Sequence, residues 1–481
     1  MTATELTALL PLVGVAGTSV VLMLAISIRR DRQWALIITI LGLALSFVLL
    51  FVARPLVPCE VTPLLIIDGF ALFFFGLLIA GSAVVAVLAS GYLARRGIAC
   101  EEFYLLLLFA TLGCCVIAAS THFASLFLGL EIHSVSLYAL IAYLRNTERS
   151  LDAGIKYLIL AAVSSAFLLF GMALIYAHTG TMAFAELASR LFPTGAEPAL
   201  MALAGLALLL VGISYKLALV PFHMWTADVY EGASAPVTAF VATASKGALV
   251  ALLVRFAAIT GAQTTTELYG FFALIAGASI IVGNLLALLQ DNVKRMLAYS
   301  SIAHLGYVMI AFLAVGARGA EAVTFYMAAY FVTILGAFGV ITVLSPVDRD
   351  LDRLDDYLGL GRARPLFAGL FTAMLLSLAG IPLTAGFVGK FLVLRAGVGA
   401  AQWTLALILV VGSVISVFYY LRVVVAMYMR SADDEASKPH TVPVSLMAGA
   451  TLAALLVALV WLGVWPAPVM ELVHGAVGAL F

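Results

Sequence analysis

The sequence predicts an all-α polytopic membrane protein with about fourteen transmembrane helices. Of its 481 residues, 64% are hydrophobic and only 10% are charged, whereas a soluble domain carries about 25% charged residues. Apolar runs long enough to cross a bilayer, which takes roughly 20 residues, follow one another along the chain. The formal net charge is zero, so nothing indicates nucleic-acid binding. Together these observations exclude a soluble protein.

The expected spans are read directly from the apolar runs. The first run lacks a basic segment in front of it and continues to Ile28, which is too long for a signal peptide and predicts a retained span. The runs lie near 6–28, 33–53, 66–94, 103–120, 123–144, 151–178, 199–231, 236–259, 267–289, 296–315, 321–344, 365–398, 402–429 and 441–464.

Two of these runs, 199–231 and 365–398, are too long for one straight helix. Each contains an internal proline, Pro221 in the first and Pro382 in the second, with Gly or Ser nearby. A helix interrupted at membrane depth exposes backbone groups that must be satisfied by protein or by a water-filled cavity. We therefore expect two broken helices, each next to a functional site.

The charges of the loops predict the orientation, because Lys and Arg accumulate on the cytoplasmic side. Basic residues gather in alternate loops, and both chain termini are expected on the opposite, non-cytoplasmic side. The residues of the basic loops are Arg29, Arg30, Arg32, Arg95, Arg96, Arg145, Arg149, Lys294, Arg295, Arg349, Arg353, Arg362, Arg364, Arg430 and Lys438.

A weak internal repeat divides the chain. Segment 138–143 resembles segment 307–312, and Pro221 corresponds to Pro382. Both offsets carry a span to the span five places later, and a shift by an odd number reverses orientation. This predicts two inverted five-helix units, an arrangement typical of transporters. The expected divisions are 1–100 for three N-terminal helices, 101–262 and 263–430 for the two units, and 431–481 for a C-terminal helix.

Five ionisable residues fall inside expected spans: Glu131, Lys216, Lys246, His304 and Lys390. Such residues are costly in a membrane and usually mark an ion or proton pathway. Single titratable groups on separate helices form no metal-ligand cluster, but they suit a proton relay. A Glu–Lys pair whose separation changes is a switchable proton site, and we expect Glu131 and Lys216 to form it. Lys246 would then pass protons laterally through His304 toward Lys390.

Other polar residues have a structural alternative. His223 and Asp228 lie just beyond Pro221, where they either feed the relay or only hold helix ends. Lys156 and Arg255 are expected to extend toward the membrane surface. His133 points to a different helix face from Glu131 and is more simply a packing residue. The charged run 347–364 is most simply a solvated amphipathic helix.

The sequence contains no motif for a redox cofactor. It lacks a Gly-rich phosphate loop after a strand and the ligand spacing of haem or iron–sulfur centres. The four cysteines form no CxxC pair and are expected to be packing residues. Cofactors of any associated redox chemistry must therefore lie in other subunits. The cysteines are Cys59, Cys100, Cys114 and Cys115.

Three motifs carry a family resemblance: YKLALVPFHMWTADVYEGASAPVTAF at 215–240, RMLAYSSIAHLGYVMIAF at 295–312 and LAGIPLTAGFVGKF at 378–391. They resemble the antiporter-like membrane subunits of respiratory complex I and the related multi-subunit cation/proton antiporters. The resemblance extends from about residue 60 to 430. It implies a fourteen-helix subunit that translocates protons, and it assigns the five ionisable residues of the expected spans to the proton path.

The resemblance also implies the molecular setting. NADH, FMN, iron–sulfur clusters and quinone are expected in partner subunits of a proton-translocating NADH–quinone oxidoreductase, and this chain is expected in the bacterial inner membrane with periplasmic termini. Its short length, the lack of a long C-terminal lateral helix and Lys390 argue against the L and M types of subunit. Those types, and a subunit of a cation/proton antiporter, remain alternatives. Lys216 precedes its proline whereas Lys390 follows Pro382, so equal roles for the two lysines are not expected.

Overall fold

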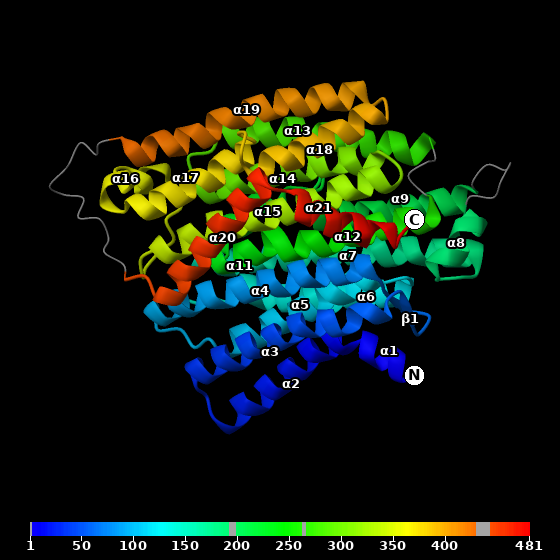
Figure 1. Ribbon diagram of the computed structural model, residues 1–481, viewed down its shortest axis with the longest axis horizontal. Coiled ribbons are helices and arrows are strands. Elements are labelled where there is room, and N and C mark those ends of the chain that lie inside the picture. The colour runs from blue at the N-terminus through cyan, green and yellow to red at the C-terminus, as the bar shows by residue number, and fades with distance from the viewer. Residues whose placement is uncertain (1, 192–198, 262–265, 430–442) are drawn as a thin grey trace.

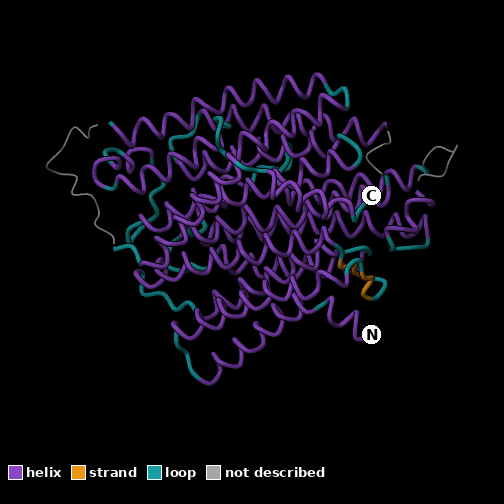
Figure 2. Tube along the Cα trace, viewed as in Figure 1, coloured by secondary structure: helices purple, strands orange, loops and turns teal. Residues whose placement is uncertain are grey.

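The computed structural model describes residues 2–191, 199–261, 266–429 and 443–481. These residues form a bundle of helices with one short β-hairpin at its edge (Figures 1 and 2). Two of the basic loop residues, Arg430 and Lys438, lie outside the described ranges, as do the boundaries expected at 262–263 and 430–431.

The N-terminal part packs three long helices along one side of the bundle. Asp31 and Asp68 accept hydrogen bonds from the first-turn amides of α3 and α4 and so fix where these helices begin. The hairpin between them was not predicted from the sequence. The elements are α1 (Ala3–Ala8), α2 (Leu10–Ile28), α3 (Arg32–Ala53), η1 (Arg54–Leu56), β1 (Cys59–Val61), β2 (Leu65–Ile67) and α4 (Gly69–Arg95).

The next segment holds the first broken helix. Helix α9 ends at Leu217, where Ala218 adopts a left-handed conformation, and the short α10 begins only at Trp225. The break predicted at Pro221 is therefore confirmed. The elements are α5 (Glu101–Ala119), α6 (Phe123–Ile141), α7 (Glu148–Thr179), α8 (Phe184–Leu191), α9 (Leu200–Leu217), α10 (Trp225–Gly232), α11 (Ala235–Phe240), the π-helical η2 (Val241–Ser245) and α12 (Lys246–Thr260).

The last segment holds the second broken helix. Helix α17 ends at Ala379, Gly380 has a φ of 87°, and α18 begins at Ala385, which confirms the break predicted at Pro382. A short helix, α21, follows the last span. The elements are α13 (Thr266–Leu288), α14 (Val293–Leu313), α15 (Ala317–Leu344), η4 (Leu354–Tyr357), α16 (Leu360–Ala363), α17 (Pro365–Ala379), α18 (Ala385–Gly399), α19 (Trp403–Tyr428), α20 (Leu446–Val464) and α21 (Ala467–Gly478).

Within the described residues, 13 helices are long and apolar enough to cross a membrane, and the shorter apolar helix Pro365–Ala379 adds a further candidate. The chain is thus a multi-pass membrane protein, close to the count expected from the sequence. Both termini lie at one end of the bundle, opposite the connection between α2 and α3 and opposite α16 (Figure 1).

The core of the bundle is formed by α11, η2 and α12 together with α14 and α15, and it includes the relay candidates Lys246 and His304. The most apolar window of Ala235–Thr260 is 100% buried, and those of α14 and α15 are 94% buried, whereas α2, α3 and α20 are no more than 33% buried. A buried polar group needs a partner from the protein, because neither lipid nor bulk water supplies one. Ionisable residues on these central helices must therefore bond to one another or to other polar side chains.

Candidate proton-transfer site

Lys216 lies in the last turn of α9, just before the first helix break, and its side chain is buried. Its Nζ donates a hydrogen bond of 2.6 Å to Ser134 Oγ on α6. Glu131 lies one turn earlier on α6, and its Oε1 accepts a hydrogen bond of 2.9 Å from Ser165 Oγ on α7. Among the described contacts the ammonium and the carboxylate form no direct ion pair, and each is held by its own serine.

Lys246 is the first α-helical residue after the π-helical segment η2 and is completely buried. Its Nζ donates to Ser301 Oγ on α14 at 2.6 Å. The same hydroxyl bonds to Tyr330 OH on α15 at 2.6 Å. A π-helical turn often marks a functional position, and here it ends at the residue before the lysine.

His304 lies between two tyrosine hydroxyls. Its Nδ1 is 2.6 Å from Tyr326 OH on α15, and its Nε2 is 3.2 Å from Tyr420 OH on α19. The Tyr420 hydroxyl also hydrogen-bonds to Ser300. Both ring nitrogens therefore have partners that can donate or accept a proton.

Lys390 lies in α18, after the second helix break. Its Nζ donates to Ala379 O at 2.8 Å and to Ser413 Oγ at 3.0 Å. A Cβ on Gly380 would approach Lys390 Cδ to 2.9 Å, so the glycine leaves room for the lysine to reach the free carbonyl of the broken helix. That carbonyl partly replaces the water that the ammonium loses on burial.

Aromatic rings connect the last three relay residues. The His304 ring lies 5.6 Å from the Tyr330 ring, which is hydrogen-bonded to the same serine as Lys246. It also lies 5.6 Å from the Tyr307 ring, and Lys390 Nζ is 5.3 Å from that ring. The structure thus gathers Lys246, His304 and Lys390 around one cluster of tyrosines in the second half of the chain.

The secondary candidates lie apart from this path. Asp228 accepts hydrogen bonds from Arg295 at 2.8 Å and from Lys156 at 3.3 Å. Lys156 is about half exposed and also pairs with Asp152 at 2.7 Å. His223 lies in the break after α9, and its buried Nδ1 has no hydrogen-bond partner within the described part of the chain. Among the contacts of the described residues, none joins Asp228, Lys156 or His223 to Lys216.

One sequence-based expectation is wrong for Arg255. Its side chain does not extend to the membrane surface but is 1% exposed, and its guanidinium forms a two-pronged pair with Asp68 at 2.6 and 2.9 Å. It also donates to Ala118 O at 3.1 Å. Because the planar guanidinium satisfies a carboxylate at two points, this pair joins α4, α5 and α12 inside the bundle.

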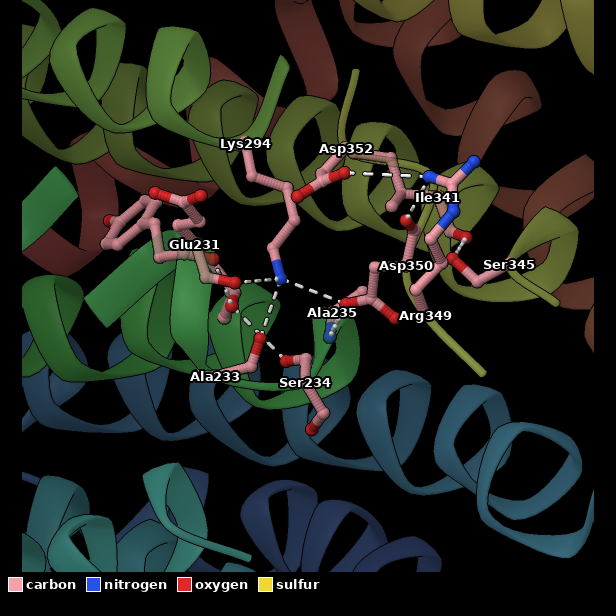
Figure 3. A network of polar contacts seen from close by, with 12 residues as sticks. Glu231, Ala233, Ser234, Ala235, Lys294, Ile341, Ser345, Arg349, Asp350 and Asp352 are labelled. Carbon is pink, nitrogen blue, oxygen red and sulfur yellow. Dashed lines mark hydrogen bonds and ion pairs between the residues drawn. The ribbon is translucent and has the colours of Figure 1, made fainter. Parts of the chain in front are cut away.

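The charged run 347–364 is also not the solvated helix expected from its composition. Residues 346–353 form no helix, and only η4 and α16 follow. Figure 3 shows how this segment is fixed against the bundle. Asp350 accepts hydrogen bonds from Lys294 Nζ at 2.9 Å and from the Ala235 amide at 3.1 Å.

Asp350 joins three helices at the end of the bundle opposite the termini. Besides Lys294 and the start of α11, its carboxylate accepts hydrogen bonds from Tyr92 OH at 2.7 Å and from Arg96 at 3.2 Å. Burial acts to raise the pKa of Asp350, but the positive charges of Lys294 and Arg96 outweigh it and hold this pKa below the ordinary carboxyl value.

Sequence reasoning missed the partners of the relay residues. Serine and tyrosine are common in membrane helices, so no sequence signal separates those that bind a lysine from those that bond to their own helix. The SSIAH stretch of 300–304 is the one place where spacing offered a hint, because Ser300, Ser301 and His304 share one helical face. The missed residues are Asp68, Ser134, Ser165, Ser301, Tyr326, Tyr330, Asp350, Ser413 and Tyr420.

Comparisons with known proteins agree with this architecture. The family model described as "NADH:quinone oxidoreductase/Mrp antiporter, TM" matches residues 120–416, which contain all five relay candidates. The fold and the buried lysines thus define an antiporter-like membrane subunit.

Similar proteins identify one family within the antiporter-like membrane subunits. Proteins named NADH-quinone oxidoreductase subunit N are 51% identical in Nitrosospira multiformis, covering 99% of this chain and 97% of the relative, and 45% identical in Methylococcus capsulatus, covering 98% and 95%. The chain belongs to the subunit N family of NADH-quinone oxidoreductase, the proton-translocating complex I.

Solved structures support the same family. A chain of respiratory complex I from Thermus thermophilus with bound aureothin is 34% identical, with a TM-score of 0.81 and coverage of 96% of this chain and 98% of that chain. A chain of the Mrp complex from Dietzia sp. shares the fold, with a TM-score of 0.86 at 22% identity and coverage of 100% and 98%.

Proposed function

We propose that this chain moves protons across the membrane through Glu131, Lys216, Lys246, His304 and Lys390, driven by quinone reduction in partner subunits of the complex. The observation that carries the proposal is the hydrogen bonding of the three buried lysines. Each lysine donates to a serine hydroxyl on another helix, and a hydroxyl can both accept and pass on a proton.

The first step concerns Glu131 and Lys216. Lys216 is the member of the pair that changes partner, because α9 ends one residue after it. A charge change nearby would bring the ammonium toward Glu131 or release it toward Ser134, and each position favours a different protonation state. The pair therefore acts as a switch that loads a proton into the chain.

The later steps use the second half of the chain. Lys246 passes the proton through Ser301 and the tyrosine cluster to His304, and Lys390 releases it. Lys216 lies before its helix break, whereas Lys390 lies beyond the break and binds the Ala379 carbonyl that the break leaves free. This difference supports loading at Lys216 and release at Lys390.

The proposed setting follows from the family. NADH, FMN, iron–sulfur clusters and quinone belong to partner subunits, and the chain lies among other membrane-arm subunits in the bacterial inner membrane with its termini on the periplasmic side. We assign residues 1–100 to an N-terminal three-helix segment, 101–262 and 263–430 to two inverted units and 431–481 to a C-terminal helix. His223, Asp228 and Lys156 would serve proton entry beside the first break.

Isolation of the chain in mild detergent tests this setting. We expect it to co-purify with a large assembly that reduces quinone with NADH and pumps protons after reconstitution. Cation/proton exchange by the purified single chain in vesicles, without NADH, would contradict the proposal and support an independent antiporter.

A further inference from the structure

His133 lies where three buried helices meet. It is 1% exposed, and its Nε2 is 2.8 Å from Ser245 Oγ at the end of the π-helical segment η2. Its Nδ1 lies 3.3 Å from Ala110 O and 3.3 Å from Cys114 Sγ, both on α5. The ring packs against Phe240 at 6.2 Å. A histidine on this face of α6 therefore contacts α5 and the helix that carries Lys246.

The partners of His133 support both neutral forms of its ring. When Nδ1 carries the proton it donates to Ala110 O, and Nε2 accepts from the Ser245 hydroxyl. When Nε2 carries the proton it donates to Ser245 Oγ, and Nδ1 accepts from the Cys114 thiol, a weak donor. A buried histidine that only holds helices together needs partners for one form. This one loses no hydrogen bond when the proton changes nitrogen.

The position of His133 fills the gap between the first two lysines of the relay. Lys216 is bonded to Ser134, the next residue along α6. On the other side, Ser245 is followed directly by Lys246. Two adjacent residues on α6 thus connect to both lysines: Ser134 binds Lys216, and His133 binds the residue before Lys246. His133 itself bonds to Ser245 and to α5.

We propose that His133 carries protons from Lys216 to Lys246, an inference that rests on the proposed function. The Lys216 ammonium swings on its flexible stem from Ser134 to the ring and gives one proton to its unprotonated nitrogen, which leaves a neutral amine. The imidazolium donates a proton from Nε2 to Ser245 Oγ, while the Ser245 hydroxyl gives its own proton to the neutral amine of Lys246. One proton has moved, and the ring is neutral again.

Two substitutions of His133 distinguish proton transfer by its ring from a purely structural role in holding the helices together. In His133→Gln the side-chain amide keeps hydrogen bonds to Ser245 and to α5 but does not take up a proton, whereas His133→Ala loses both functions. His122→Asn is the matched control, because His122 lies at the start of the same helix and only caps it, with Nδ1 accepting from the Ala124 amide at 3.1 Å.

The variants are measured in the intact complex in inverted membrane vesicles. The readout is NADH-driven proton uptake, normalised to the assembled complex by NADH oxidation with an artificial acceptor. We expect a several-fold loss in both His133 variants and wild-type uptake in His122→Asn. Wild-type uptake in His133→Gln, with or without a loss in His133→Ala, would overturn the inference and leave His133 a structural residue.

A parallel Lys216→Ala variant distinguishes failure of the role of His133 from failure of the proposed proton translocation through Lys216. If Lys216→Ala stops uptake while His133→Gln pumps normally, only the role of His133 fails. If assembled Lys216→Ala complex pumps normally, the proposed function itself fails, and the inference fails with it.

Discussion

Lys216 donates a hydrogen bond of 2.6 Å to Ser134, and Ser134 lies one helical turn after Glu131 on the same helix. The glutamate is held in turn by Ser165 on α7. The acid and the base are thus kept near one another by two hydroxyls rather than by a direct ion pair. Such an arrangement lets a small movement of α9 decide whether the lysine faces the carboxylate or the next carrier.

The hydrogen bond from Lys216 to Ser134 can be tested against a control substitution at a nearby serine on the same helix. Ser134→Ala removes the partner of a buried ammonium, which costs about 1.5–3 kcal/mol, and we expect proton uptake to slow by roughly tenfold. Ser136→Ala is the control, because among the described residues Ser136 Oγ bonds only to Ile132 O of its own helix, at 2.8 Å. Equal uptake rates in the two variants, measured in vesicles with NADH, would show that Ser134 does not hold the relay lysine.

Lys390 and its serine partner offer a similar comparison. Lys390→Ala is expected to block proton release and to reduce NADH-driven uptake strongly, with the complex still assembled. Ser413→Ala removes one of the two partners of Lys390 and should have a smaller effect of the same sign. Ser416→Ala should pump normally, because within the described part of the chain its hydroxyl bonds only to Ser413 O of the same helix. Unchanged pumping by the assembled Lys390→Ala complex would show that Lys390 does not release the proton.

The buried pair of Asp68 and Arg255 should matter for stability rather than for pumping. Breaking one partner leaves an uncompensated charge, so Arg255→Met is expected to lower the free energy of unfolding by about 3–5 kcal/mol. The double variant Asp68→Asn with Arg255→Met should recover part of the loss. The control Glu186→Ala breaks a pair that is about half exposed and should change stability by less than about 1 kcal/mol. Thermal unfolding in detergent measures all three, and a double variant no more stable than Arg255→Met would contradict this account.

Because the pKa of Asp350 is lowered in the folded protein, we expect the stability of the fold to depend on pH. This pKa is lower in the folded protein than in the unfolded chain, so the contribution of Asp350 is complete above the unfolded value of about 3.9 and is lost as the pH falls through the folded value. Asp350→Asn should therefore unfold at lower temperature than the wild type at pH 7, and the difference should shrink below about pH 4. A difference that stays constant down to pH 3 would show that the charge of Asp350 does not stabilise the fold.

The large features of the fold followed from the sequence because they depend on composition and on proline. Apolar runs gave nearly all spans, and Pro221 and Pro382 marked both breaks, since a helix interior cannot accommodate proline without loss of a backbone hydrogen bond. The buried lysines were also visible, because a charge in an apolar run stands out. Their grouping was not visible, since it depends on which helices pack together.

Two wrong expectations have the same cause. Arg255 lies near the end of an apolar run, and the sequence alone did not reveal that Asp68, far away in the chain, lies within 2.6 Å of it. The segment 347–364 has alternating charges, which suit a solvated helix as well as a folded loop. Only the position of Lys294 on α14 shows why Asp350 is drawn into the bundle. Long-range ion pairs of this kind have no local sequence signal.

In the proposed mechanism, Lys216 carries the protons that are pumped. The most direct test is the rate of proton uptake per NADH oxidised by the intact complex in inverted vesicles, compared between wild type and Lys216→Ala, with the assembled amount checked by NADH oxidation with an artificial acceptor. We expect that the Lys216→Ala complex assembles but that its coupled proton uptake is abolished or greatly reduced. Wild-type proton uptake by the fully assembled Lys216→Ala complex would contradict it.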